Sequence, residues 1–274
     1  MHRSLLEILV CPACRADAPL ELRADASQGD DIAEGALRCP CGACYAIRRS
    51  TPRFVATEED YCGNFGFQWQ RWKSIQVDRL AGHHVYETRY FDQVPWDREW
   101  MRGKLILDVG CGSGPFTDVA AQYGARVVAC DLSNAIDACR DNTRVHGDRV
   151  HTVQASIYAL PFREGVFDAA FCFGVIQHTP DPALTMDSIP RFVRGGGLLA
   201  YDFYEKTPWE RPWVPRYFLR RFTPRWSQER LLLFSHVLTA IFFLPAWVLA
   251  HLRLLRPYLP ALPIAIETHR ELSI

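Results

Sequence analysis

The chain has 274 residues, of which 49% are hydrophobic and 23% are charged. This composition is typical of a folded protein and excludes a disordered one. The length allows one domain of ordinary size with a small module beside it. Because 31 lysines and arginines balance 31 aspartates and glutamates, no overall basic field attracts nucleic acid, and a nucleic-acid partner is not expected.

The ten cysteines do not form the framework of a secreted, disulfide-bonded protein. Five of them lie in two tight clusters between Cys11 and Cys44, and residues 1–7 have too short an apolar run for a secretory signal. We therefore expect metal-bound or free thiols and a cytoplasmic location.

The first zone, residues 1–56, has the cysteine spacing of a zinc site. The C-x-x-C pair Cys11 and Cys14 is followed, after 24 intervening residues, by a C-P-C-G-A-C run that holds Cys39, Cys41 and Cys44. Two thiolate pairs on either side of a hairpin suit tetrahedral Zn²⁺, and four thiolates leave no open position, so the metal would be structural. The second cluster offers three thiols, those of Cys39, Cys41 and Cys44, for the two remaining ligand positions. The alternative is a module that has lost its metal and packs through apolar contacts.

The stretches Leu5–Cys14 and Leu37–Phe54 resemble a zinc-ribbon module that is fused to bacterial methyltransferases. They are also similar to the small activator subunits of some methyltransferases. In that pattern the C-G pair, here Cys41-Gly42, carries a ligand. The resemblance implies a role in stabilising the fold or in docking a protein partner. It also implies that the zinc ligands are Cys11, Cys14, Cys39 and Cys41, with Cys44 as a substitute.

The second zone, residues 57–102, is rich in aromatic and polar residues and predicts a helical lead-in to the next domain. Some of its side chains are candidates for a lid over a bound cofactor. The alternative is that they pack in the core, which is the usual role of aromatic residues. The candidates are His83, His84, Tyr86 and Tyr90.

The third zone begins the domain of residues 103–274 and alternates apolar runs with helical patterns up to residue 205. This alternation predicts right-handed βαβ crossovers and an α/β fold, with a Rossmann-like, mostly parallel sheet that has helices on both faces. Ser133 is the predicted N-cap of the second helix. The predicted strands are Leu105–Val109, Arg126–Cys130, Val150–Val153, Phe167–Phe173 and Gly197–Phe203, and the predicted helices are Pro115–Tyr123, Asn134–His146 and approximately Pro182–Val193.

A G-x-G-x-G loop, Gly110 to Gly114, lies where the first predicted strand gives way to a helix. Glycines there allow a sharp turn and a close approach of a ligand to the backbone. Asp131, at the end of the second strand, is placed to accept hydrogen bonds from both ribose hydroxyls of a nucleoside cofactor. The spacing differs from the dinucleotide fingerprint, so a nicotinamide oxidoreductase is not expected. The alternative is a glycine-rich turn without a ligand.

At this point the chain resembles the class I methyltransferases. The run D-V-G-C-G-S-G from Asp108 matches their first motif, which holds the methionine part of S-adenosylmethionine, and A-S-I-Y-A-L-P-F from Ala155 resembles the segment beside the adenine. Ser156 stands where that family usually has aspartate. The runs F-D-A-A-F-C-F-G-V-I-Q-H and R-G-G-G resemble their later motifs. The implied cofactor residues are Asp108, Gly110, Cys111, Gly112, Gly114, Asp131, Leu132, Ser156, Ile157 and Phe173.

Methyl transfer from a sulfonium requires alignment and a dry site, and it requires a base only when the acceptor must lose a proton. His178, after the fourth predicted strand, is the candidate base, and the alternative is a histidine that bonds only the backbone. The expected acceptor is a small molecule, apolar or lipid-linked. The alternatives are an RNA base methyltransferase and a degenerate, non-catalytic scaffold.

The last zone contains an apolar helical segment over about 207–256. Leu231–Ala250 has no Asp, Glu, Lys or Arg. We expect two helices, broken near Pro245, that form an apolar lid over the substrate crevice. Attachment to a membrane surface and true spanning are the alternatives. Pro263–Ile274 would supply one strand, which leaves an incomplete sheet edge.

Overall fold

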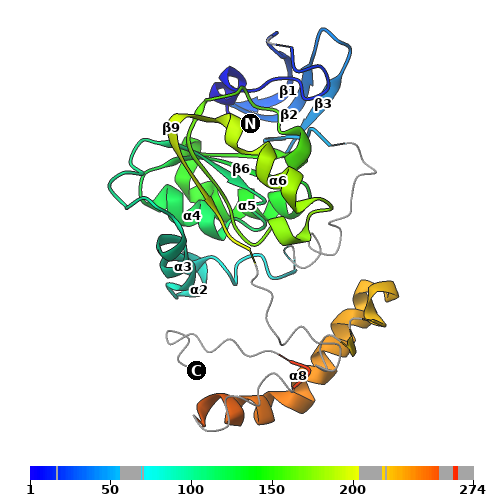
Figure 1. Ribbon diagram of the computed structural model, residues 1–274. Helices are drawn as coiled ribbons and strands as arrows, with labels where there is room; N and C mark the ends of the chain where they lie inside the picture. Colours follow the sequence, from blue (N-terminus) through cyan, green and yellow to red (C-terminus); the bar gives the residue numbers. More distant parts are fainter. Residues whose placement is uncertain are drawn as a thin grey trace. The chain divides into compact units, whose positions relative to one another are not determined.

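The N-terminal unit of the computed structural model, Met1–Tyr204, contains two β-sheets, and Glu205–Ile274 form a second unit (Figure 1). The structure describes residues 1–16, 18–55, 69, 71–203, 218–219, 221–252 and 262–264. Most of the lead-in before residue 69 and most of the predicted strand Pro263–Ile274 therefore lie outside the described residues.

The first sheet is antiparallel and has the strand order β1-β2-β3-β4. A short 3-10 helix, η1 (Arg3–Glu7), precedes it. Gly29 turns the first hairpin with a φ of 60°, a conformation that favours glycine. The strands are β1 (Glu21–Gln28), β2 (Asp31–Arg38), β3 (Cys44–Arg48) and β4 (Thr51–Pro52).

The second sheet has five parallel strands in the order β7-β6-β5-β8-β9. The chain thus starts in the middle of the sheet, builds outward to one edge, and then crosses back to the other, which confirms the Rossmann-like fold class. Buried apolar residues dominate the central strands, as expected for a parallel sheet covered on both faces. The strands are β5 (Leu105–Val109), β6 (Arg126–Asp131), β7 (Val150–Gln154), β8 (Phe167–Cys172) and β9 (Val193–Tyr201).

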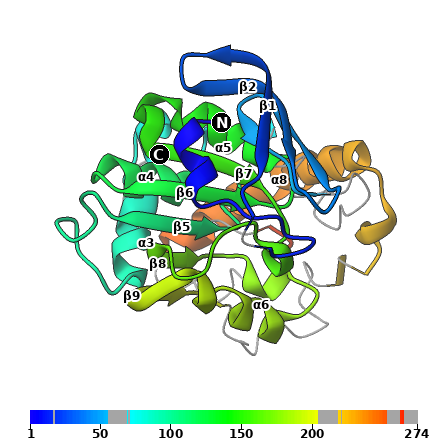
Figure 2. The same ribbon diagram turned by 90° about the horizontal axis from the view of Figure 1, so that it is seen from above.

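Two different layers cover the faces of the parallel sheet. Strand side chains that point to one face, such as Ile106 and Val127, pack in a core with α3 and α4. Those that point to the other face, such as Leu107 and Val128, pack in a core with η1, the antiparallel sheet and the loop before β8. Figure 2 shows the N-terminal segment lying over the strands. The ribbon therefore takes part of the place that helices were predicted to fill. The helices are α2 (Asp78–Ala81), α3 (Val85–Gln93), α4 (Pro115–Gln122), α5 (Ala135–Thr143) and α6 (Pro182–Ser188).

Two predicted helices differ from the structure at their ends. The helix predicted to reach His146 ends at Thr143 and continues as the 3-10 helix η2 (Arg144–Arg149). Ser133 is not the N-cap: that position is Asn134, although the Ser133 hydroxyl accepts the N–H of Ala135.

The predicted third helix splits into α6 and the 3-10 helix η5 (Pro190–Phe192). Pro190 has no N–H to donate to a helical hydrogen bond, so α6 ends before it, although Ile189 keeps a helical backbone conformation. The shorter elements η3 (Ile157–Ala159) and η4 (Ile176–His178) follow β7 and β8.

The second unit contains one long helix, α8 (Gln228–His251), after the 3-10 helix η7 (Thr223–Arg225). The prediction of two helices broken near Pro245 is wrong, because α8 continues through this proline. A proline removes one hydrogen bond and can be accommodated inside a helix, usually with a kink, without ending it. The Ser227 side chain caps the first turn by accepting from the N–H of Arg230. The predicted role of this segment as a lid stays a prediction.

Candidate cofactor site and zinc ribbon

The glycine loop after β5 is built so that only glycine fits at its key positions. Gly110 and Gly114 have φ values of 79° and 83°. A Cβ on Gly110 would lie 2.3 Å from the Val175 side chain, and one on Gly114 would lie 2.6 Å from the sulfur of Cys139. The loop is therefore packed between the end of β8 and helix α5, with its backbone turned as a ligand-binding loop requires.

Asp131, at the end of β6, lies directly against this loop. One of its carboxylate oxygens accepts the N–H of Gly112 at 2.9 Å, and the other accepts the N–H and hydroxyl of Ser133 at 2.8 and 2.7 Å. The structure thus brings together the two features that the sequence predicted as one cofactor site. The carboxylate is partly exposed, as an acceptor for ribose hydroxyls must be.

Asp108 lies below the loop and is 2% exposed. The hydroxyl of Thr117, in the first turn of α4, donates to it at 2.5 Å. Burial, together with the nearby charge of Asp131, raises the pKa of Asp108 to about 7, against the lowering effect of the Thr117 hydrogen bond. Asp108 therefore fastens the loop to α4, and a direct contact with the cofactor stays a prediction.

The other predicted cofactor residues follow β5, β6, β7 and β8 at the same edge of the sheet. Cys111 and Ile157 are buried, and the Ser156 hydroxyl caps η3 by accepting the N–H of Tyr158. Phe173 stacks on Phe171 with ring centroids 5.2 Å apart. The carboxyl ends of parallel strands are the usual ligand crevice of such folds, which agrees with the predicted grouping.

Two residues beside the loop were missed by the sequence analysis. The indole of Trp69 lies 3.3 Å from where a Cβ on Gly112 would stand. The Asn142 side chain donates to the carbonyls of Lys73 and Ser113, at 2.6 and 2.8 Å, and so ties the lead-in to the loop. The aromatic composition of residues 57–102 was the signal, but it did not single out Trp69.

The side chains proposed as a lid behave differently from one another. Tyr90 is fully buried, and the Trp96 N–H donates to its hydroxyl, so the packing alternative holds for this residue. His83 bonds Asp78 at 2.7 Å, and His84 bonds Glu87 at 3.1 Å. A lid role for Tyr86 and the two histidines stays a prediction.

His178 is exposed at the end of η4, and its backbone N–H donates to the carbonyl of Val175. Because the Val175 side chain packs against Gly110, this turn borders the cofactor loop. The position is compatible with the predicted role of a base at the mouth of the crevice.

Four cysteines of the first sheet converge on one point. Their sulfur atoms all lie within 4.8 Å of one another, with 3.8 Å between Cys11 and Cys41 and 3.6 Å between Cys14 and Cys39. A tetrahedron of thiolates at the Zn–S distance of about 2.3 Å has edges of about 3.8 Å, so these positions fit zinc. Cys44 stands outside the group, at the start of β3 opposite Arg38.

Two stretches of the chain match known families. Residues 107–201 match the family described as a methyltransferase domain, and residues 2–50 match the family described as Trm112p-like protein. The chain thus has a stretch similar to a Trm112p-like domain followed by a stretch similar to a methyltransferase domain. This confirms both resemblances seen in the sequence, together with S-adenosylmethionine as the cofactor of such a domain and four close cysteines suited to structural zinc.

Among similar curated proteins are several named ubiquinone biosynthesis O-methyltransferase. That of Azotobacter vinelandii is 32% identical over 142 residues, which cover 50% of this chain and 60% of the relative. That of Aromatoleum aromaticum is 36% identical over 105 residues, which cover 37% and 44%. The chain thus spans less than two thirds of the length of these relatives.

Two solved structures are similar to parts of the chain. A SAM dependent methyltransferase from Aquifex aeolicus is 16% identical, with a TM-score of 0.41 and coverage of 52% of this chain and 77% of that one. A chain of the complex that contains the Haloferax volcanii Trm112 methyltransferase activator is 22% identical, with a TM-score of 0.42 and coverage of 54% and 65%.

The Trm112p-like domain is joined to the methyltransferase domain by backbone pairing as well as by a common core. The N–H of Phe54 donates to the carbonyl of Gln154 at 2.7 Å, and Arg53 forms an isolated parallel bridge with Gln154, so the segment after β4 pairs with the outer edge of β7. A second pair of backbone hydrogen bonds joins the segment after η1 to the loop before β8. The N–H of Val10 donates to the carbonyl of Pro161 at 2.9 Å, and the N–H of Arg163 donates to the carbonyl of Ile8 at 2.8 Å. The ribbon thus covers β7, which would otherwise be an open edge strand of this sheet.

Gln154 connects this junction to the cofactor site. Gln154 is buried, with a relative exposure of 6%. The Arg53 guanidinium donates to its amide oxygen at 2.7 Å, and its amide nitrogen donates to the carbonyl of Leu132 at 2.9 Å. Leu132 follows Asp131 directly. One buried amide therefore links the ribbon to the residue next to the predicted ribose acceptor.

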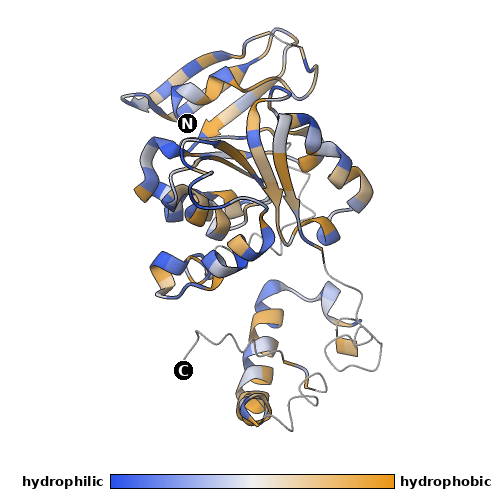
Figure 3. Cartoon of the chain, turned by 60° about the vertical axis from the view of Figure 1, so that its left-hand side comes forward, coloured by the Kyte–Doolittle hydropathy of each residue, from blue (hydrophilic) through white to orange (hydrophobic). Residues whose placement is uncertain are grey.

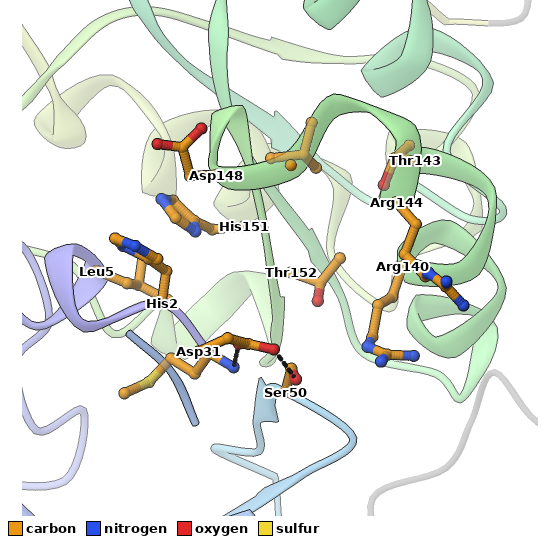
Figure 4. A pocket seen from close by; sticks show the side chains of 13 residues that line it. His2, Leu5, Asp31, Ser50, Arg140, Thr143, Arg144, Asp148, His151 and Thr152 are labelled. Atoms are coloured by element: carbon orange, nitrogen blue, oxygen red, sulfur yellow. Dashed lines mark hydrogen bonds and ion pairs between the residues drawn. The ribbon is translucent and has the colours of Figure 1, made fainter. Parts of the chain in front are cut away.

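A cavity of about 300 Å³ lies at the same junction, and none of its lining residues belongs to the glycine loop (Figure 4). His2 of the ribbon stacks on His151 of β7 with centroids 5.9 Å apart. Burial, followed by the charges of His2 and Arg126, lowers the pKa of His151 to about 4. Its Nε2 atom is buried without a hydrogen-bond partner among the described residues, so His151 is held neutral at pH 7.

Proposed function

We propose that the chain transfers the methyl group of S-adenosylmethionine to an oxygen of a small apolar acceptor of the quinone-precursor type. The observation that supports the proposal is the contact between the Asp131 carboxylate and the N–H of Gly112, because it joins the residue proposed to accept the ribose hydroxyls to the glycine loop. The oxygen acceptor is taken from the name that the relatives carry, ubiquinone biosynthesis O-methyltransferase.

The residues of this site have separate tasks in the proposed reaction. The glycine loop would contact the methionine part through its backbone, and Asp131 would accept the ribose hydroxyls. Ser156 and Ile157 would border the adenine. When bound, the cofactor supplies a methyl group on a positively charged sulfur, which departs as a neutral thioether, so alignment and exclusion of water are the main requirements.

His178 would act on the acceptor and not on the cofactor. A phenolic hydroxyl becomes a better nucleophile when a neighbouring base removes its proton. In the proposed step the acceptor oxygen forms a bond to the methyl carbon, the carbon–sulfur bond breaks, and the phenolic proton moves to the imidazole of His178. The exposed position of His178, beside the loop that touches Gly110, supports this assignment.

The first test is calorimetric titration of the purified chain with S-adenosylhomocysteine. Wild-type protein should bind in the micromolar range. Asp131→Ala should bind at least about ten-fold more weakly, because hydrogen bonds to a charged acceptor contribute about 1.5–3 kcal/mol. Asp131→Asn retains one oxygen for the Gly112 N–H and should lie between the two. Asp187→Ala, at an exposed acid of α6, is the matched control.

Equal affinity of wild type and Asp131→Ala would reject the cofactor site. An absence of binding by a folded, zinc-loaded chain would favour the scaffold alternative. Binding without turnover of phenolic quinone precursors, but with methylation of RNA, would replace the proposed acceptor by a base.

We also propose that the Trm112p-like domain binds its partner within the same chain. The surface paired with β7 and residues 161–163 is occupied by the methyltransferase domain, so this surface serves as an intramolecular support for the cofactor site. The catalytic unit is placed in the cytoplasm, where its free thiols and zinc thiolates would stay reduced. Among the described residues, α8 is the helix long and apolar enough to attach the chain to a membrane.

A further inference from the structure

Helix α8 has the composition and length of a membrane-spanning segment. Among the described residues it is the one helix that meets both criteria, with a mean hydropathy of 2.0 in its most apolar window. Only 6% of that window is buried, whereas the core helix of a soluble protein is mostly buried. The helix begins at Gln228, far from the N-terminus where a signal sequence would lie.

The dimensions of α8 agree with those of a bilayer. Its 24 residues extend for about 36 Å, and the hydrocarbon core is about 30 Å thick. Trp226 lies just before the N-cap Ser227, and Trp247 lies in the last two turns of α8. Tryptophans are enriched at the two membrane interfaces, so each end of the apolar run has a residue typical of an interface.

Apolar residues run along α8 (Figure 3) and lie on every side of it, as expected for a spanning helix and not for one that lies on a surface. At about 100° per residue, Leu233, Leu238 and Leu232 point in three directions that are about 100–140° apart. An interfacial helix has a charged face opposite an apolar one, and α8 has no charged residue from Leu231 to His251. Its internal polar residues Ser235 and Thr239 can bond the carbonyls of the preceding turn.

We propose that α8 spans a lipid bilayer and anchors the chain with its methyltransferase domain on the cytoplasmic side. The charge distribution sets this orientation. Six arginines lie in the 20 residues 211–230 before the apolar run, and three lie in the 20 residues 252–271 after it. Flanking arginines and lysines favour the cytoplasmic side. The anchor is independent of the acceptor chosen above, since it depends on no residue of the cofactor site.

The test uses the full chain with a C-terminal epitope, expressed in bacteria and separated into membrane and soluble fractions. Wild-type protein should stay in the membrane pellet after washing with alkaline carbonate. The double variant Val237→Arg, Ile241→Arg places two charges on one side of the middle of the helix. It should lower the ratio of pelleted to soluble protein by about ten-fold or more. The single variant Val145→Arg, at a residue 63% exposed in the methyltransferase domain, should pellet like wild type.

A topology experiment decides between spanning and surface attachment. Protease added to intact spheroplasts should remove the C-terminal epitope and leave the methyltransferase domain intact. Extraction of the wild-type chain by carbonate would overturn the proposal. So would an epitope that is protected together with the methyltransferase domain, because both ends of α8 would then lie on the same side. Equal pelleting of the double variant and wild type would also overturn it, since α8 would not be the anchor.

Discussion

Replacing Leu9 by alanine tests whether the Trm112p-like domain and the methyltransferase domain unfold as one unit. Leu9 has no exposed surface and pairs with Phe162, across the junction, in an isolated β-bridge. It belongs to a core that includes Leu37 of the ribbon and Leu107 and Val153 of the parallel sheet. Because one apolar core serves both domains, a cavity at Leu9 should destabilise both.

The size of the effect follows from the atoms removed. Leucine to alanine deletes three carbon atoms, worth about 2.4 kcal/mol at about 0.8 kcal/mol for each buried carbon. The residual cavity raises the cost to about 3 kcal/mol, within the range of about 2–5 kcal/mol for buried leucines. For a unit of about 200 residues, each kcal/mol lowers the melting temperature by about 2–4 °C. The expected decrease for Leu9→Ala is therefore about 6–12 °C.

Two probes report the two domains separately. Residues 1–56 contain no tryptophan, so tryptophan fluorescence follows the methyltransferase domain and the later segments. Cobalt substituted for zinc gives a thiolate absorption band that follows the ribbon. Both transitions should move down together in Leu9→Ala. Leu184→Ala, at a leucine of α6 that is 50% exposed, should move neither by more than about 2 °C. A shift of the cobalt band alone would refute a common folding unit.

Three further changes probe the zinc site, the junction histidine and the buried amide. Cys41→Ser should lose bound zinc, whereas Cys44→Ser should keep one zinc per chain by elemental analysis; the reverse result would reassign the ligand. The pKa of His151 is about 4 in the folded chain and about 6.5 unfolded, so the unfolded state binds more protons between these values. Stability should therefore fall by up to about 3 kcal/mol as the pH falls from 6.5 to 4, and urea unfolding of His151→Phe should lack this slope; an unchanged slope would exclude His151 as its source. Gln154→Ala leaves the Leu132 carbonyl unsatisfied and should weaken S-adenosylhomocysteine binding about five-fold at unchanged zinc content; unchanged affinity would show that this bond does not shape the site.

The sequence predicted the features that depend on local patterns. Buried apolar runs gave the five parallel strands to within a few residues, and the glycine spacing with Asp131 gave two parts of the candidate site that are in contact. Pairing between distant segments leaves no such local pattern. The contact of Trp69 with the loop and the bond from Gln154 to Leu132 arise only after folding, and neither residue type is diagnostic by itself.

Other differences have a definite physical cause. Pro190 interrupts a helix where the sequence predicted a continuous one, whereas Pro245 does not. Both lack a donor, but Pro190 begins the 3-10 turn that leads into β9, and Pro245 lies in the third quarter of a long apolar helix whose other turns hold it together. The sequence also assigned helices to both faces of the sheet, since helical periodicity does not reveal that an antiparallel module occupies part of one face.

A closed four-thiolate zinc site performs no chemistry, so any influence on methyl transfer must be mechanical. The mechanical path in this structure is short. Gln154 pairs with Asp131 in the sheet register, its carbonyl accepts from Phe54, and its side chain bonds Arg53 and Leu132. A displacement of the ribbon edge would therefore strain the strand end that carries Asp131, the predicted ribose acceptor. Separate chains would have to form this contact by association, whereas a covalent fusion supplies the ribbon at high effective concentration. Zinc held by the four cysteines would thus stabilise the ribbon, and the position of the ribbon, rather than the metal itself, would affect the predicted cofactor site.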